Sequence, residues 1–479
     1  MNELVRMAAV QLVALYRTRT VSPVEVTRAL LDHLEEVNGK VNAIVAVATD
    51  EAMRAAEEAE RQYAKDEAGK LAGVPLSVKD TIVTQGTRTT YGSLLYEFYV
   101  PDADAVVVER SRQAGGIVFG KTNTPEFGWK GETSNRVFGA TRNPWDLGRT
   151  SGGSSGGAAA AVATGIGPIG LGSDTAGSVR IPAAFCGVVG MKPSFGRIPV
   201  APRRGLETLS HVGIVSRSVR DAALVLDAVA GRDARDRFSL EDASAGFLDR
   251  LDKTPGALRI AWSADLGFVS VDPQVRGIAE SALACFEEVG WTVEDLGATV
   301  ADPYEVVHVM LCAALAGQRS NDYEAVRDRL DPGCRELIEE GFRLTGAECG
   351  AAMQECGAWA EAWRRLWAPY DLIVTPTVPL PAFEAGADRP NARQGDADTG
   401  RVLSWTPFTY PLNISGQPAA SVPCGFTDEG LPVGLQIIGR WRDDLSVLHA
   451  AACLESRRPW DSVWPSVCEP SNGSRGRGE

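Results

Sequence analysis

The sequence of 479 residues predicts a layered α/β fold with one large hydrophobic core. Helical and strand-like segments alternate along the chain, which is typical of this class. Apolar residues make up 44% of the sequence, which is ample for a large core. No internal repeat or long linker divides the chain. We therefore expect a single domain over residues 1–466 and a disordered tail at 467–479.

The first half of the chain has a clear helix start and several apolar runs. Ser22-Pro23-Val24-Glu25 is a capping box with proline at the first helical position, so a helix is expected to begin there. A short apolar run at 74–78 ends at Lys79 and predicts a strand. The expected elements of this half are helices at 23–37, 49–67, 105–114 and 156–164 and strands at 74–78 and 116–119.

The second half begins with a mostly helical region at 218–367, and residues 300–368 are predicted to form a helical insert. The segment 383–399 is polar and rich in small residues, so it predicts a surface loop. Strands are expected at 258–262, 291–296, 370–374, 419–424 and 433–438, and a final helix at 443–455.

Charge and cysteine usage exclude several classes of partner. The net charge of -14 argues against nucleic acid and anionic membranes. Residues 1–20 resemble an amphipathic helix more than a signal peptide, and no apolar run reaches 18 residues. The nine cysteines show no CxxC pair, which indicates free thiols in a reducing compartment. We expect a cytoplasmic monomer or homodimer.

The stretch 148–200 contains the residues that indicate chemistry. Ser154 and Ser178 each lie among glycines and other small residues, and Lys79 lies upstream. No histidine occurs between His33 and His211, so a lysine is the obvious candidate for the base. A lysine can accept a proton only when neutral, which requires burial or a cationic neighbour. The pattern predicts acyl transfer at an amide-type carbonyl by a Ser-Ser-Lys system.

Other interpretations of this stretch are weaker. A Walker A loop needs GxxxxGK[ST], but alanines follow Gly157. The GxGxxG pattern that begins at Gly165 follows an alanine-rich helix instead of a strand, and it contains Pro168. A purely structural role for the glycines, at tight turns between packed elements, also stays open. Cys186 lies in an apolar context that makes a thiol inert, so we interpret it as a core residue.

Several segments together resemble the amidase signature family. They are GVPLSVKD (73–80), KTNTPEFG (121–128), GGSSGG (152–157), SVRIPAAFCGVVGMKP (178–193), YDLIVTPT (370–377) and NISGQPAASVPCG (413–425). The resemblance covers nearly the whole chain. It implies the amidase signature fold, a central mixed and twisted β-sheet with helices on both faces. It also implies a hydrolase of carbon–nitrogen bonds in linear amides that needs no metal and no organic cofactor.

The resemblance also implies roles for individual residues. Ser178 is expected to be the acylated nucleophile, Ser154 a bridging serine after a cis peptide bond, and Lys79 the base. The expected oxyanion hole consists of the backbone N–H groups of Thr175, Ala176, Gly177 and Ser178. Ser155, Asp174 and Arg180 are expected to orient the site.

The substrate is less well defined by the sequence. The pocket walls are expected from Phe127, Gly128, Trp129 and Lys130 and from the helical insert, with 405–408 as a segment that could close the pocket. An aromatic pocket would suit aryl amides, anilides, or carbamates (urethanes). Trp359, Trp363 and Trp367 lie on one helix face, and we favour core packing for them over substrate contact.

The main alternative is the glutaminase component of the glutamyl-tRNA(Gln) amidotransferase, its A subunit, which belongs to the same family. Ile181 stands where that subunit has glutamine, and the segment 210–214 departs from its usual pattern. These differences favour a stand-alone amidase.

Overall fold

The computed structural model describes residues 2–202, 208–241, 246–253, 255–391 and 401–468, and its centre is a mixed sheet. Within these residues the sheet has eleven strands in the order β1-β3-β2-β6-β8-β7-β12-β13-β11-β9-β10. The strands are β1 (Ile44–Val47), β2 (Pro75–Lys79), β3 (Ile117–Thr122), β6 (Ile169–Asp174), β7 (Val189–Lys192), β8 (His211–Ser216), β9 (Arg259–Trp262), β10 (Thr292–Asp295), β11 (Leu372–Pro376), β12 (Ala419–Phe426) and β13 (Pro432–Gly439).

Strand β2 lies inside the sheet, where it pairs in parallel with both β3 and β6. On its other side β6 pairs antiparallel with β8, so the sheet is mixed, as the family resemblance implied. Side chains alternate between the two faces of a strand. Leu76 and Val78 belong to the core on one face, and Lys79 therefore points to the other.

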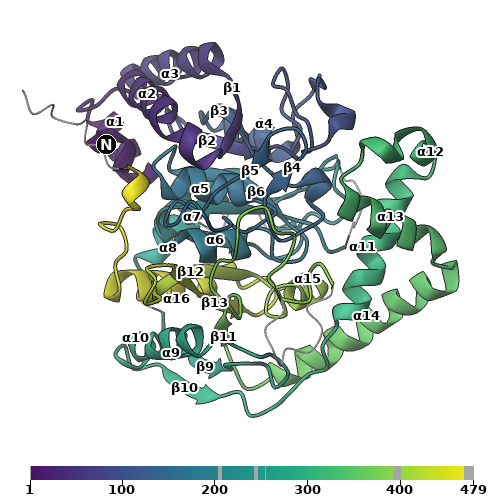
Figure 1. Ribbon diagram of the computed structural model, residues 1–479. Helices are drawn as coiled ribbons and strands as arrows, with labels where there is room; N and C mark the ends of the chain where they lie inside the picture. Colours follow the sequence, from purple (N-terminus) through teal and green to yellow (C-terminus); the bar gives the residue numbers. More distant parts are fainter. Residues whose placement is uncertain (1, 203–207, 242–245, 254, 392–400, 469–479) are drawn as a thin grey trace, which may run out of the picture.

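Helices cover both faces of the sheet (Figure 1). One face packs against α2 (Pro23–Val41), α3 (Thr49–Ala64), α5 (Gly156–Ala163) and α6 (Arg180–Cys186). The other packs against α1 (Ala9–Arg17), α4 (Val106–Gln113), α7 (Val219–Val229), α9 (Pro273–Ser281) and α16 (Asp444–Arg457). The predicted α/β class, with helices on both faces of a mixed sheet, is therefore confirmed.

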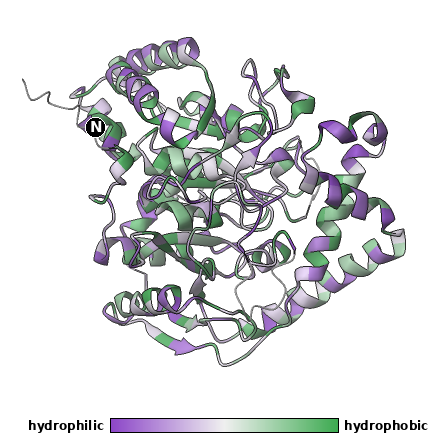
Figure 2. Ribbon diagram, in the orientation of Figure 1, coloured by the Kyte–Doolittle hydropathy of each residue, from purple (hydrophilic) through white to green (hydrophobic). Residues whose placement is uncertain are grey.

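A group of helices stands apart from these layers, at the right of Figure 1. It comprises α11 (Tyr304–Arg319), α12 (Tyr323–Val326), α13 (Pro332–Arg343) and α14 (Gly346–Leu366), and it matches the helical insert expected at 300–368. Helix α11 packs against both α13 and α14. Hydrophilic and hydrophobic residues alternate along these helices in Figure 2, as expected for helices with one buried face.

The remaining elements are short helices and a small hairpin of two strands. The helices are α8 (Phe247–Leu251), α10 (Ala284–Glu287), α15 (Pro411–Ser415) and the 3-10 turns η1 (Glu3–Arg6), η2 (Leu94–Tyr96), η3 (Glu126–Gly128), η4 (Arg327–Arg329) and η5 (Ser466–Cys468). The hairpin pairs β4 (Ser134–Asn135) with β5 (Gly139–Ala140). Across the part of the chain that the structure describes, no helix is both long and apolar enough to span a membrane.

The predicted elements are present with shifted ends, but the strands β1, β6, β7 and β8 escaped prediction. Strand β6 shows why, because glycines alternate with apolar residues in it and glycine has low strand propensity. A Cβ at Gly170 would lie 2.9 Å from the Cβ of Ala158, and one at Gly172 would lie 2.8 Å from Ser155 Oγ. These glycines allow helix α5 to approach the sheet closely, and they explain part of the glycine-rich pattern.

Two predicted segments lie partly outside the described residues. Only 383–391 of the loop 383–399 is described, and within it Phe383 is buried against Phe185 and Trp405. Of the tail 467–479 only Val467 and Cys468 are described, and both are buried. All nine cysteines are free thiols.

Candidate active site

Strand β2 ends at Lys79, whose side chain is fully buried between the sheet and the glycine-rich segments. Its Nζ donates hydrogen bonds to Ser154 Oγ at 2.7 Å and to Ser173 Oγ at 3.0 Å. Burial lowers the pKa of Lys79 to about 7, although the nearby Asp174 carboxylate opposes the shift. A large fraction of this amine is therefore neutral near pH 7 and able to accept a proton.

Ser154 is held in place by a close backbone contact before it. The peptide bond between Gly153 and Ser154 is cis, as the family resemblance implied. A Cβ at Gly153 would lie 2.6 Å from the carbonyl oxygen of Glu132, so only glycine fits there. The N–H of Ser155 donates to the carbonyl oxygen of Ser178 at 3.0 Å, which ties the two serine segments together.

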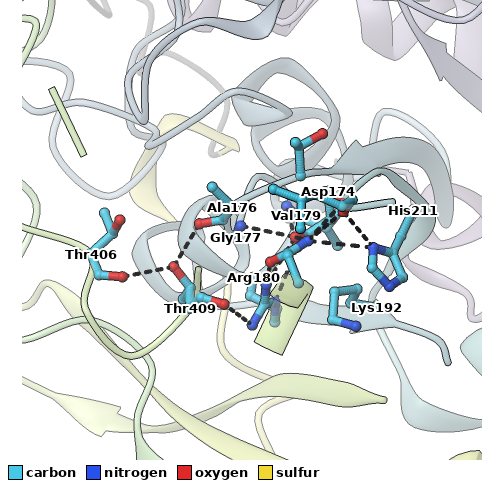
Figure 3. Close-up of polar contacts among 12 residues, drawn as sticks. Asp174, Ala176, Gly177, Val179, Arg180, Lys192, His211, Thr406 and Thr409 are labelled. Atoms are coloured by element: carbon cyan, nitrogen blue, oxygen red, sulfur yellow. Dashed lines mark hydrogen bonds and ion pairs between the residues drawn. The ribbon is translucent and has the colours of Figure 1, made fainter. Parts of the chain in front are cut away.

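Ser178 follows a tight turn that begins where β6 ends. Gly177 has a φ of 115° in this turn, and a Cβ there would collide with the Thr409 side chain. Asp174 Oδ1 accepts from the N–H of Gly177 at 2.8 Å, and Oδ2 accepts from the N–H of Val179 at 3.1 Å (Figure 3). The sequence grouped the Gly177 N–H with the oxyanion donors, but in the structure it is directed at the Asp174 carboxylate.

A buried ion pair supports this turn. Arg180 contacts both carboxylate oxygens of Asp174 at 2.9 and 3.0 Å, and both side chains are fully buried (Figure 3). Burial would raise the pKa of Asp174, but Arg180, Lys192 and Asn413 together outweigh burial and hold that pKa well below its usual range. Asn413 accepts from Arg180 and donates to Asp174, and Gln436 accepts from Arg180.

Sequence reasoning expected Asp174 and Arg180 to orient the site but missed several of their partners. Ser173, Thr409, Asn413 and Gln436 all contact residues of this site. Asn413 lay in a family motif and Ser173 in the stretch 148–200, whereas Thr409 and Gln436 lay in neither. The motif that begins at Asn413 contained a signal for these contacts, because a buried asparagine needs polar partners.

The two serines open onto a cavity of about 410 Å³. Both Ser154 and Ser178 line it, together with Ser173 and Thr175. Phe127 and Gly128, two of the expected pocket residues, also line this cavity. Its wall further includes Tyr91, Tyr96, Ile82, Val107, Val200, Val212 and Arg319.

The other two expected pocket residues line a second space beside the same serine. Trp129 and Lys130 border a much smaller space of about 20 Å³, which Gly128, Thr175 and Ser178 also line. The amine of Lys130 is engaged by Glu132 at 3.1 Å and Asp388 at 2.5 Å. Trp129 and Lys130 therefore lie beside Ser178 but do not line the main cavity.

The three tryptophans at 359, 363 and 367 are all buried in a cluster with Leu296, Phe408 and other apolar residues. The Nε1 atoms of Trp359 and Trp363 donate to Ala301 and Gln417. Core packing was the favoured interpretation, and the structure agrees with it. Trp405, from the segment expected to close the pocket, instead stacks on Phe185 with ring centroids 6.0 Å apart.

Comparison with known proteins places this arrangement in a family. The amidase family model matches residues 25–448. The chain is 39% identical to an acylamidase of Rhodococcus erythropolis over 96% of this chain and 97% of that protein. It is 34% identical to the A subunit of the glutamyl-tRNA(Gln) amidotransferase of Carboxydothermus hydrogenoformans, over 97% of this chain and all of that one.

Solved structures agree with the sequence comparisons. The crystal structure of a bacterial aryl acylamidase superimposes with a TM-score of 0.89 at 29% identity, and the match covers 97% of this chain and 99% of that one. That enzyme is itself an amidase signature protein. On this fold and these matches, the chain belongs to the amidase signature family of hydrolases, which act on amides.

Proposed function

We propose that this chain is a stand-alone amidase that forms an acyl-enzyme on Ser178, with Lys79 as the base acting through Ser154. The observation that supports this most directly is the hydrogen bond of 2.7 Å from the buried Lys79 amine to Ser154 Oγ. Ser154 and Ser178 line the same cavity, which supports a relay from Ser178 through Ser154 to Lys79.

The reaction follows from these positions. Ser178 Oγ attacks the carbonyl carbon, and its proton moves to Lys79 through Ser154. The N–H groups of Thr175, Ala176 and Ser178 are the candidates for binding the oxyanion, and each such donor can be worth about 10²–10³ in rate. Lys79 then returns the proton through Ser154 to the leaving nitrogen, the C–N bond breaks, and water hydrolyses the acyl-enzyme.

The cavity favours a substrate with an aromatic or other apolar group. Phe127 and Tyr96 meet edge to face with centroids 6.2 Å apart, and Tyr91 meets Tyr96 at 5.1 Å. Arg319 lies over the rings of Tyr96 and Phe127, so the wall also offers one cationic group. We infer that aryl amides and anilides are the main substrates. Aryl carbamates react through the same tetrahedral chemistry and are candidates too.

Hydrolysis by the purified chain alone tests this proposal. The panel contains an aryl anilide, an aryl carbamate, a short aliphatic amide and glutamine, with Ser178→Ala as control. We expect turnover of the anilide that the variant loses. If the short amide is hydrolysed as fast as the anilide, the aromatic pocket does not select the substrate.

The glutaminase component of the amidotransferase is the second candidate, because the chain is 34% identical to such a protein over its whole length. Ile181, at the position where such subunits typically have glutamine, is buried beside Gly177. This alternative would be supported if glutamine were the one substrate of the panel that is hydrolysed. It would also be supported if activity required added partner subunits.

A further inference from the structure

Helices α11 and α13 bring three potential metal ligands together, away from the two catalytic serines. His308 and Cys312 are one turn apart on α11 and so share a face, and Glu340 lies on α13. His308 Nε2 lies 2.9 Å from Glu340 Oε1 and 3.6 Å from Cys312 Sγ. All three donor atoms lie within 4.8 Å of one another.

Neighbouring residues hold the three side chains in place, and solvent reaches them from one side. Cys312 is fully buried and His308 is 5% exposed. The ring of Tyr304 stacks on His308 with centroids 5.7 Å apart, and its hydroxyl lies 3.5 Å from Nδ1. Nε2 is therefore left to face the other two ligands. The Glu340 side chain is 42% exposed, so solvent reaches the cluster from that side.

We propose that His308, Cys312 and Glu340 bind a zinc ion, with water as the fourth ligand. Zinc takes mixed sulfur, nitrogen and oxygen ligands in a tetrahedron. Its usual bond lengths place S and N about 3.6 Å apart and N and O about 3.3 Å apart. The observed distances of 3.6 and 2.9 Å are close to these values. Binding releases the thiol proton of Cys312 to solvent and requires no redox step.

The same atoms do not form a catalytic cysteine site. In a cysteine–histidine–acid relay the thiol and the carboxylate contact different ring nitrogens. Here Cys312 and Glu340 both approach His308 Nε2, which suits convergence on one ion.

The ion would join α11 to α13 within the helical insert. Helix α11 also carries Arg319 at the cavity wall, about three turns beyond His308. The proposal does not depend on the nature of the amide substrate, since its test measures metal binding.

Metal binding to the full chain tests the proposal. The protein is stripped with a chelator, loaded with one equivalent of Zn²⁺, gel-filtered and assayed for zinc by mass spectrometry. A parallel titration with Co²⁺ follows the absorption of a cobalt–thiolate bond. We expect about one zinc per chain and a cobalt–thiolate band, since a three-ligand site of this kind holds its ion.

Two variants and a control complete the test. Cys312→Ser preserves shape and should abolish the cobalt–thiolate band, and Glu340→Gln should weaken zinc binding at least about tenfold. Cys356→Ser changes a partly buried thiol of the same insert and should behave as wild type. Circular dichroism establishes that each variant is folded. The proposal is overturned if the wild type retains no zinc, or if Cys312→Ser keeps the thiolate band.

Discussion

Lys79 and Lys121 occupy neighbouring strands and look alike by burial. Lys79 ends β2 and Lys121 lies opposite Val78 on β3. Both side chains are fully buried, and burial lowers the pKa of each to about 7. Each also lies near an acidic group, Asp174 for Lys79 and Asp80 for Lys121.

Their hydrogen bonds separate them. Lys121 Nζ donates to the carbonyl oxygen of Ile82, to Thr84 Oγ1 at 2.8 Å and to Thr89 Oγ1 at 3.1 Å, so its amine holds one loop together. Lys79 donates to two serine hydroxyls that border the cavity. A lowered pKa therefore does not by itself identify a base, and contact with a cavity hydroxyl is the observation that favours Lys79 in the proposed mechanism.

The largest contrast is expected from removing each amine. Lys79→Met should reduce kcat/KM by about 10²–10⁴ while the protein stays folded, because proton transfer loses its base. Lys121→Met should change kcat/KM by less than about tenfold but destabilise the fold by about 1–3 kcal/mol, because three acceptors lose their donor. Anilide kinetics and thermal melting measure both. Equal losses of activity would remove the distinction between the two lysines.

A second contrast concerns the hydroxyl that each lysine contacts. Ser154→Ala should lower kcat/KM by about 10²-fold or more, because the proton path from Ser178 to Lys79 is cut. Thr84→Val removes a hydroxyl from Lys121 and should leave kcat/KM within about threefold, because no reacting proton crosses it. Steady-state kinetics of both variants provide the measurement. Wild-type rates in Ser154→Ala would exclude Ser154 from proton transfer.

The pH dependence of kcat/KM tests the difference between Lys79 and Lys121 without removing the Lys79 amine. Lys79 must be neutral to accept a proton, so kcat/KM should be low in acid, rise through about pH 7 and level off above it. Lys121→Met should leave the midpoint in place, because Lys121 does not contact the serines. A profile that stays flat from pH 6 to 10 with chemistry rate-limiting would rule out Lys79 as a titrating base.

The smallest effect is expected at Ser173, the second acceptor of the Lys79 amine. This hydrogen bond stabilises the charged amine more than the neutral one. Ser173→Ala should therefore move the midpoint of the kcat/KM profile to lower pH, by less than about one unit. The rate on the alkaline plateau should fall by less than about tenfold. A midpoint that moves to higher pH would contradict the assigned donor and acceptor roles.

The sequence was informative wherever the relevant pattern is local. The capping box at Ser22 predicted the start of α2, and apolar runs predicted β2 and β3. The sequence did not predict β6, because the glycines that allow close helix packing there weaken the strand pattern. It grouped Trp129 and Lys130 with Phe127 and Gly128 as pocket walls, and the structure places them at a smaller space that also borders Ser178.

By itself the sequence determined the α/β class and the family motifs that contain Ser154, Ser178 and Lys79, because fold class and motif depend on local composition and spacing. Only the tertiary structure decided which buried lysine meets a cavity hydroxyl and which distant side chains support the turn. Asn413 reaches Asp174 across 239 positions of sequence. Such contacts arise when packing brings remote segments together, and no local pattern encodes that distance.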